Sequence, residues 1–246
     1  MKARPAWMNH LLRLGALLLL CALALQLVFA ARIALMNVLA PQSTTFQRSE
    51  AWRLLVEKHT LRWSQDWVAG NRISPNLKRA VIASEDAGFT QHGGVDWDAI
   101  EKAWERNQRA EQRAQRPAAS PAPPKVVGGS TITQQLAKNL FLSGERTALR
   151  KAQEMLLTLM LENLLGKQRI LEVYLNNVEW GEGVFGAQAA AQHYFRVDAS
   201  RLSPEQAARL AVMLPAPKRF EKRPGSPYVV GRAATIVARM GAVELP

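Results

Sequence analysis

Cysteine and histidine are scarce in this chain of 246 residues, which contains a single cysteine, Cys21, and four histidines. One cysteine cannot close a disulfide within the chain, and the sequence shows no group of His and Cys with zinc-ligand spacing. A metal ion would therefore have to be a hard cation held by carboxylate and phosphate oxygens. Internal repeats and convincing alternating strands are also missing from the sequence, so we predict a mainly helical fold.

Acidic residues are outnumbered: the chain has 20 Asp and Glu and 32 Lys and Arg, which gives a net charge of +12. Such a balance favours an anionic partner. Nucleic acid, a membrane surface and a phosphorylated substrate all meet that requirement, and charge alone does not choose among them.

The stretch 14–31 carries no charge, and the apolar pattern resumes after Arg32. It is long enough to cross a bilayer, which takes about 20 residues. We predict a transmembrane anchor over 14–36. The alternative is a cleaved signal peptide, because residues 28–30 resemble a cleavage site, although the apolar run exceeds the core of about 7–15 residues that such peptides have.

The cations around this run predict its orientation. Lys2, Arg4 and Arg13 precede the run and Arg32 alone follows it. The positive-inside rule then leaves the N-terminus, residues 1–13, in the cytoplasm and exports the bulk of the chain. We expect an exported domain over 45–246.

A helix that begins after Ser74 carries the first candidate catalytic group. Ser74 can cap the first turn, and Pro75 fits the first helical position. The apolar arc of this helix comprises Leu77, Val81 and Ile82. Glu85 projects beside that arc, so its carboxylate needs a cationic or hydrogen-bonding partner or a raised pKa, and either state suits a general base. The alternative is a solvated or ion-paired surface glutamate.

A second informative stretch runs over 128–142. Thr131 and Gln134 have the spacing of a capping box for a helix whose apolar stripe is Ile132, Leu136 and Leu140. The opposite face carries Thr131, Gln134, Gln135 and Lys138. Because this face holds donors and a cation beside a helix N-terminus, it suits a phosphate-bearing ligand. An ordinary amphipathic helix is the alternative.

The stretch 145–175 predicts a further helix with a charged side. Arg146, Arg150 and Glu154 recur every four residues, and Arg before Glu is the weaker order for a helix ion pair, so the series favours a site. Residues 155–161 are apolar nearly all round and predict a central, buried element.

The remaining segments predict packing rather than chemistry. Ser203 as a cap and Pro204 at the first position predict a helix over 202–214. We expect a short helix over 97–104 with both of its tryptophans on one face, and after it a mobile basic segment over about 105–126 whose first part can be helical. His193 stands among alanines and aromatic residues, which is typical of a hydrogen-bonded core histidine.

Four motifs in this order resemble the glycosyltransferase family 51 enzymes, the peptidoglycan glycosyltransferases. They are EDAGFTQHGG from Glu85, GGSTITQQLAKN from Gly128, RKAQE from Arg150 and KQRILEVYLNNVEWGEGVFGAQAAAQHYF from Lys167. The resemblance spans about residues 70–220. With one anchor and neither Ser-x-x-Lys nor Lys-Thr-Gly in the sequence, the chain is similar to the monofunctional members, which lack a transpeptidase domain.

The resemblance implies a lysozyme-like helical fold with a large lobe and a small membrane-embedded jaw, after one transmembrane helix. It implies polymerisation of lipid II into β-1,4-linked glycan strands, with inversion and release of undecaprenyl pyrophosphate. The implied partners are lipid II, the growing glycan chain, the lipid bilayer of the bacterial inner membrane and other cell-wall synthesis proteins. Nucleic acid is not among them.

Roles for individual residues also follow from the resemblance. Glu85 matches the general base, Lys138 and Arg146 match residues that hold the leaving pyrophosphate, and Glu154 matches a second carboxylate that acts through a divalent cation, Mg²⁺ or Mn²⁺, or through the pyrophosphate surroundings. The supporting motif positions are Asp86, Phe89, His92, Ser130, Thr131, Gln134, Gln135, Asn139, Arg150 and Lys151.

Two other functions stay open at this point. A lytic muramidase on the same scaffold would not require the cations Lys138, Arg146 and Arg150, because it cleaves a neutral glycan. A non-enzymatic, membrane-anchored scaffold would bind anionic lipid or nucleic acid through its charge, and Glu85 would then be dispensable.

Overall fold

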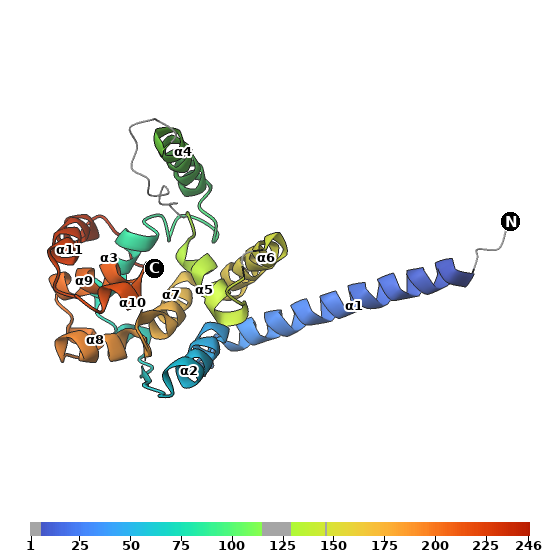
Figure 1. Ribbon diagram of the computed structural model, residues 1–246, viewed down its shortest axis with the longest axis horizontal. Helices are drawn as coiled ribbons and strands as arrows, with labels where there is room; N and C mark the ends of the chain where they lie inside the picture. Colours follow the sequence, from blue (N-terminus) through green and yellow to red (C-terminus); the bar gives the residue numbers. More distant parts are fainter. Residues whose placement is uncertain (1–5, 115–128, 146) are drawn as a thin grey trace. The chain divides into compact units, whose positions relative to one another are not determined.

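The computed structural model describes the backbone of residues 6–114, 129–145 and 147–246 (Figure 1). The chain divides into two compact units, Met1–Ala40 and Pro41–Pro246, and each is described by itself. Arg146 and the later part of the predicted basic segment lie outside the described residues.

The first unit contains one long helix, α1 (Ala6–Leu35). Within it, Trp7–Leu35 is the one described helical stretch that is long and apolar enough to cross a membrane. It contains most of the anchor predicted over 14–36 and starts earlier. Its leucines are open to the surroundings, since Leu18 is 63% and Leu27 is 70% exposed.

The second unit is mainly helical in its described part, which confirms the predicted fold class. Its α-helices are α2 (Thr45–Lys58), α3 (Pro75–Glu85), α4 (Trp97–Ala114), α5 (Ile132–Phe141), α6 (Ala148–Leu164), α7 (Lys167–Asn177), α8 (Ala187–Phe195), α9 (Pro204–Met213), α10 (Pro217–Phe220) and α11 (Pro227–Met240). Short 3-10 helices occupy Gly70–Arg72 and Ala199–Arg201. α3, α9 and α11 pack on one another, and α5 packs against α2, α6 and α7 (Figure 1).

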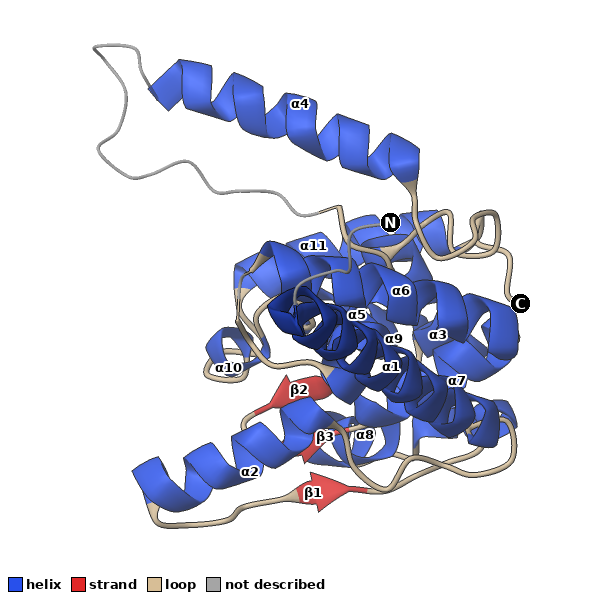
Figure 2. Cartoon of the chain, turned by 90° about the vertical axis from the view of Figure 1, so that its right-hand side faces the viewer, coloured by secondary structure: helices blue, strands red, loops and turns tan. Residues whose placement is uncertain are grey.

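A small sheet lies beside α2 and α8 (Figure 2). Its strands are β1 (Ser64–Gln65), β2 (Glu179–Gly181) and β3 (Val184–Phe185), in the order β1-β3-β2, with β1 parallel and β2 antiparallel to β3. The sequence showed no convincing alternating strand, and these three short strands are an addition to the mainly helical fold that it predicted. Strands of two or three residues are too short to show alternation in a sequence.

Gly183 is required at the turn between β2 and β3. Its φ is +73°, and a Cβ there would lie 2.0 Å from the carbonyl oxygen of Arg62. A side chain would be strained by the backbone conformation and blocked by this contact. The glycine thus allows the segment before β1 to approach the hairpin closely.

The predicted helix starts are confirmed where a side chain caps them. The hydroxyl of Ser74 accepts a hydrogen bond from the Asn76 N–H, and Pro75 takes the first position of α3. Thr131 and Ser203 each form a complete capping box, at α5 and α9. These caps fix the first turns of α3, α5 and α9.

The predicted short helix over 97–104 and the mobile segment after it were partly wrong. α4 continues to Ala114, so the helical part of the basic segment is longer than expected. The tryptophans of α4 do not pack on the core, since Trp97 is 68% and Trp104 is 65% exposed, whereas Ala103 is buried.

Two further predictions of burial were wrong. In α6, Leu157 and Leu161 are buried, but Leu156 and Leu159 are 47% and 43% exposed, so this helix has one outward apolar face. His193 is exposed on α8 rather than part of the core.

Candidate functional site

Glu85 is the last residue of α3 and is half-buried. Its Oε2 accepts a hydrogen bond of 3.0 Å from the Nε2 of Gln135 on α5. Burial raises the pKa of Glu85, and the neighbouring Asp86 adds to this, while hydrogen bonds from Gln135 and Ser84 act in the opposite direction. A carboxyl group whose pKa is raised and which still keeps a donor is suited to accept a proton near neutral pH.

Gln135 connects Glu85 to the core of the domain. Its Oε1 accepts a hydrogen bond of 2.9 Å from the hydroxyl of Tyr174 on α7. Tyr174 is 1% exposed. The two ends of one amide therefore link a buried hydroxyl to the candidate base.

Asp86, directly after Glu85, joins α3 to the start of α5. Its Oδ2 accepts the N–H of Ile132 at 3.0 Å, and its Oδ1 accepts the Nε2–H of His92 at 2.8 Å. The Nδ1 of His92 accepts the N–H of Gly94, so the ring proton is on Nε2. Asp86 and His92 thus act as a clasp that ties the end of α3, directly after Glu85, to residues 92–94 and to the start of α5.

Asp86, His92 and Asp96 are the one described group of acidic and histidine side chains close enough to share a metal ion, with ligand atoms within 4.8 Å of one another. The clasp already uses both oxygens of Asp86 and both ring nitrogens of His92. Asp96 accepts the N–H of Ala99 at the start of α4. Because these atoms hold the backbone, the group fits a structural role better than a metal site.

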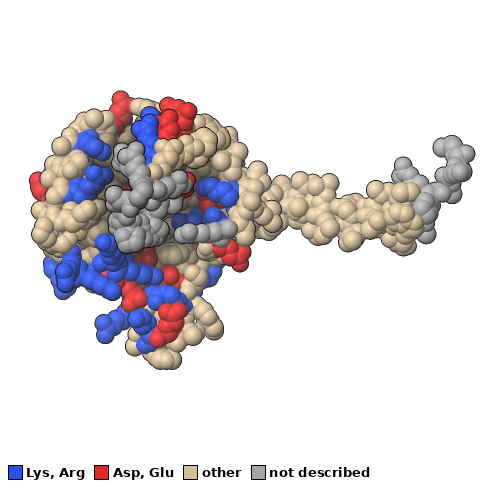
Figure 3. Space-filling view, turned by 45° about the horizontal axis from the view of Figure 1, so that its top comes forward, with Lys and Arg blue, Asp and Glu red and all other residues tan. Residues whose placement is uncertain are grey.

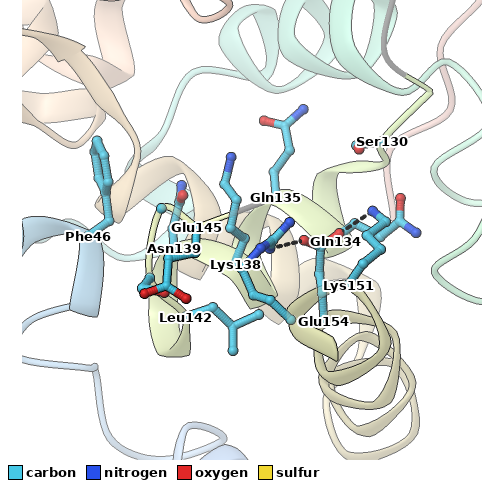
Figure 4. Close-up of a pocket in the computed structure, with 13 residues that line it drawn as sticks. Phe46, Ser130, Gln134, Gln135, Lys138, Asn139, Leu142, Glu145, Lys151 and Glu154 are labelled. Atoms are coloured by element: carbon cyan, nitrogen blue, oxygen red, sulfur yellow. Dashed lines mark hydrogen bonds and ion pairs between the residues drawn. The ribbon is translucent and has the colours of Figure 1, made fainter. Parts of the chain in front are cut away.

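Three of the predicted cations, Lys138, Arg150 and Lys151, line a cavity of about 320 Å³ between α5 and α6. Gln135 and Lys138 project from α5, and Glu154 on α6 carries dashed ion pairs to its cationic neighbours (Figure 4). The predicted site residues in its wall are Ser130, Gln134, Gln135, Lys138, Asn139, Arg150, Lys151 and Glu154. The structure therefore brings together nearly all of the predicted phosphate-binding face.

Glu154 is 3% exposed and is paired on both of its oxygens. Oε2 accepts the Nη1 of Arg150 at 2.7 Å, and Oε1 pairs with the ammonium of Lys151. The order Arg150 before Glu154 still forms an ion pair, although it is the weaker order in an isolated helix. A divalent cation at Glu154 would have to displace one of these partners and approach the other, so the described residues do not form a protein metal site there.

Glu85 opens into a second cavity, of about 370 Å³, rather than into the cationic one. Ser130 lines both cavities, and Gln135 lines the first while it donates to Glu85. The candidate base and the cations thus line two cavities that have Ser130 in common, and Gln135 reaches from the wall of the first cavity to Glu85 in the second.

The Glu85 cavity also contains two arginines that the sequence reasoning missed, Arg106 on α4 and Arg232 on α11. Arg106 lies on the helix after Glu85, at the start of the predicted basic segment, and Arg232 lies on the last helix, and no spacing around either residue pointed to a site. Their charge makes this cavity suitable for an anionic group as well.

The other predicted residues have structural surroundings. Thr131 is 2% exposed, and its hydroxyl caps α5 and donates to the Gly94 carbonyl at 2.7 Å. Gln134 is buried as the other half of that capping box. Phe89 is fully buried beneath the ammonium of Lys167, 4.6 Å from the ring centre. Arg146 cannot be placed, because it lies outside the described residues.

The positive net charge of the chain is visible on the surface. Figure 3 shows a face on which lysine and arginine side chains gather in several groups, with acidic side chains beside some of them. This surface fits the anionic partner that composition predicts.

Comparison with known proteins identifies close relatives. A family model described as Transglycosylase matches residues 55–241. The "Biosynthetic peptidoglycan transglycosylase" proteins of Paraburkholderia xenovorans (strain LB400) and Paraburkholderia phytofirmans are each 50% identical over 245 residues, which cover 99% of this chain and 97% of each relative. The protein of the same name from Burkholderia thailandensis is 55% identical over 224 residues, or 91% of this chain and 83% of the relative.

Proposed function

The chain belongs to the transglycosylase family, and from this premise we propose that it polymerises lipid II into β-1,4-linked glycan strands and releases undecaprenyl pyrophosphate. One observation carries the proposal. A half-buried carboxyl with a raised pKa, Glu85, adjoins a cavity lined by Lys138, Arg150 and Lys151. Base and cations on two sides of one reacting centre suit transfer of a sugar from a diphosphate.

In the proposed reaction Glu85 takes the proton of the 4-hydroxyl on the GlcNAc of the acceptor. The resulting oxygen attacks C1 of the donor sugar, and the bond from C1 to the diphosphate oxygen breaks, with its electron pair leaving on the diphosphate. Attack from the side opposite the leaving group inverts an α-linked donor to a β-linked product. Asp86 and His92 keep the backbone that carries the base in place.

The leaving diphosphate needs positive charge more than it needs a proton. Lys138, Arg150 and Lys151 line the cavity next to the base, and Arg146 is the further cation proposed from the family motif. Preorganised charges of this kind stabilise the developing anion without reorganisation. A muramidase would instead need a carboxylic acid near the leaving oxygen, and a neutral glycan gives no reason for this group of cations.

The proposed divalent cation, Mg²⁺ or Mn²⁺, is best placed on the substrate. Both oxygens of Glu154 are paired with cations, so diphosphate oxygens are the better ligands. Within the protein, Glu154 then serves to hold Arg150 and Lys151 toward the cavity.

The proposed location is the bacterial inner membrane. The apolar helix over Trp7–Leu35 supports a single anchor, and the cations at Lys2, Arg4 and Arg13 support a cytoplasmic N-terminus. The catalytic domain would then face the periplasm, where lipid II, the growing glycan, the bilayer and other cell-wall synthesis proteins are its partners.

The test is to incubate the purified full-length protein with lipid II, with and without Mg²⁺, and to separate the products by size. Glycan polymer together with released undecaprenyl pyrophosphate is the expected result. Disaccharide fragments from preformed glycan would support a muramidase, and no turnover of either substrate would support a binding scaffold.

A further inference from the structure

We propose that Tyr174 is a positioning residue for the candidate base: its buried hydroxyl fixes the orientation of the Gln135 amide, which in turn holds the carboxylate of Glu85. The inference rests on the proposed function, in which Glu85 accepts the proton of the acceptor hydroxyl. Tyr174 does not touch the substrate in this account, and it acts only through Gln135.

The geometry of the amide is the first argument. In the orientation observed, Oε1 of Gln135 accepts from the Tyr174 hydroxyl at 2.9 Å, and Nε2 donates to Glu85 at 3.0 Å. Rotating the amide by 180° would turn its carbonyl oxygen toward the carboxylate, and two acceptors would then face each other without a proton. One orientation of the amide therefore supports the base, and the other repels it.

The state of the tyrosine decides which orientation the amide takes. Burial raises the pKa of Tyr174 well above its ordinary value, and the nearby carboxylates of Glu85 and Asp86 raise it further. The hydroxyl therefore keeps its proton throughout the working range and must donate it. A buried hydroxyl left without an acceptor is costly, so the Gln135 carbonyl oxygen is held on the side of the tyrosine.

The groups that face Glu85 come from several elements. Asp86 follows it directly, Gln135 approaches from α5, and Arg106 on α4 and Arg232 on α11 line the same cavity together with Asp96. Among them, the hydrogen bond from Gln135 lowers the pKa of Glu85 against the effect of burial. Weakening this bond should raise that pKa, and the base would then need a higher pH to lose its proton.

The experiment is a pH profile of lipid II polymerisation for the full-length protein and for Tyr174→Phe. A hydrogen bond to a charged group contributes about 1.5–3 kcal/mol, so partial loss of its orientation should move the acidic midpoint up by about one pH unit. Well below the midpoint the rate should fall about tenfold, and above it less than about threefold. An unchanged midpoint would overturn the proposal.

The matched control is Tyr194→Phe. Tyr194 also donates a hydrogen bond from its part-buried hydroxyl, to the carbonyl oxygen of Trp180 at 2.8 Å, and it lies outside both cavities of the site. It should lose similar stability without moving the midpoint. An equal shift in this control would mean that any lost tyrosine hydroxyl has the effect, and the proposal would be overturned.

Gln135→Leu is a second variant in case Tyr174→Phe does not fold. It removes the amide while Tyr174 is intact, and it should raise the midpoint at least as much. In the double variant the midpoint should equal that of Gln135→Leu alone, because Tyr174 acts only through the amide. Additive shifts of the midpoint, or no shift in Gln135→Leu, would contradict the proposal that Tyr174 acts on Glu85 through Gln135.

Failure of this inference is distinguishable from failure of the proposed function. If the wild-type protein polymerises lipid II and Tyr174→Phe, Gln135→Leu and the double variant all share its midpoint, the role of Tyr174 is wrong and the function stands. If the wild-type protein makes no polymer, the proposed function itself is wrong and the role of Tyr174 goes with it.

Discussion

Glu179, on β2, is a buried carboxyl outside the candidate site, and its ionisation should make the domain less stable as the pH rises. It is 6% exposed, and its Oε1 has no hydrogen-bond partner in the described part of the chain. The nearest ammonium, that of Lys218, lies 3.6 Å from it and is already paired with Glu50. Burial is the main reason that the pKa of Glu179 is raised to about 7, and the partly opposing charge of Lys218 does not compensate.

The magnitude follows from this rise. An increase from 4.5 to about 7 corresponds to about 3 kcal/mol, since one pKa unit is about 1.4 kcal/mol. Because the folded protein binds this proton more tightly than the unfolded chain, the stabilising contribution is complete below pH 4.5. It is lost progressively as the pH rises to about 7, and it is absent above that value.

Glu179→Gln keeps the shape of the side chain and removes its ionisation. The variant should match the wild-type protein near pH 4.5 and exceed it by up to about 3 kcal/mol at pH 8. For a domain of this size about 1 kcal/mol moves Tm by roughly 2–4 °C, so thermal unfolding at the two pH values resolves the difference.

The control is Glu182→Gln, three positions further along the chain, just after β2. Its carboxylate is only partly buried, and a hydrogen bond from Arg53 is the main reason that its pKa is lowered, so the substitution should give no gain at pH 8. A Glu179→Gln variant that is less stable than the wild-type protein at pH 8, or equally shifted at both pH values, would refute the reasoning.

Three further predictions concern the site. Lys138→Ala should lower turnover by about tenfold to several hundredfold, because one preorganised charge at the leaving diphosphate is lost. Its control, Lys102→Ala on the exposed face of α4, should change the rate little. Equal rates for both variants would contradict this role of Lys138. Thr131→Val should cost about 1–2 kcal/mol in urea unfolding, since it removes the cap of α5 and the hydrogen bond to Gly94, and an unchanged midpoint would show that the cap is dispensable. A chelator should slow polymerisation without changing the Tm of the substrate-free protein, because the cation is proposed to bind the diphosphate, and a Tm lowered by the chelator would place the cation on the protein.

Local features of the fold were predictable from the sequence. The caps at Ser74, Thr131 and Ser203 depend on residues only two or three positions apart, so their patterns can be read directly. The buried stripe of α5 follows from the helical period in the same way. The need of Glu85 for a hydrogen-bonding partner was also predictable, because it follows from its place on an apolar face.

Long-range features were not predictable. The partner of Glu85 comes from fifty positions away, and Arg232 reaches the same cavity from the last helix, so no spacing in the sequence announces either contact. The prediction that the leucines of α6 are buried on all sides failed for a different reason. An apolar segment is expected to be covered, and nothing in its own sequence says on which side it is left open.

The most direct test of the central claim is the rate of lipid II polymerisation by Glu85→Gln, measured beside Glu101→Gln, whose carboxyl is exposed on α4. Loss of a general base lowers a rate by about 10²–10⁴-fold. Glu85→Gln should therefore polymerise lipid II more slowly by that factor, while its Tm stays close to that of the wild-type protein. Glu101→Gln should polymerise normally. A folded Glu85→Gln variant that makes polymer at the wild-type rate would contradict the account.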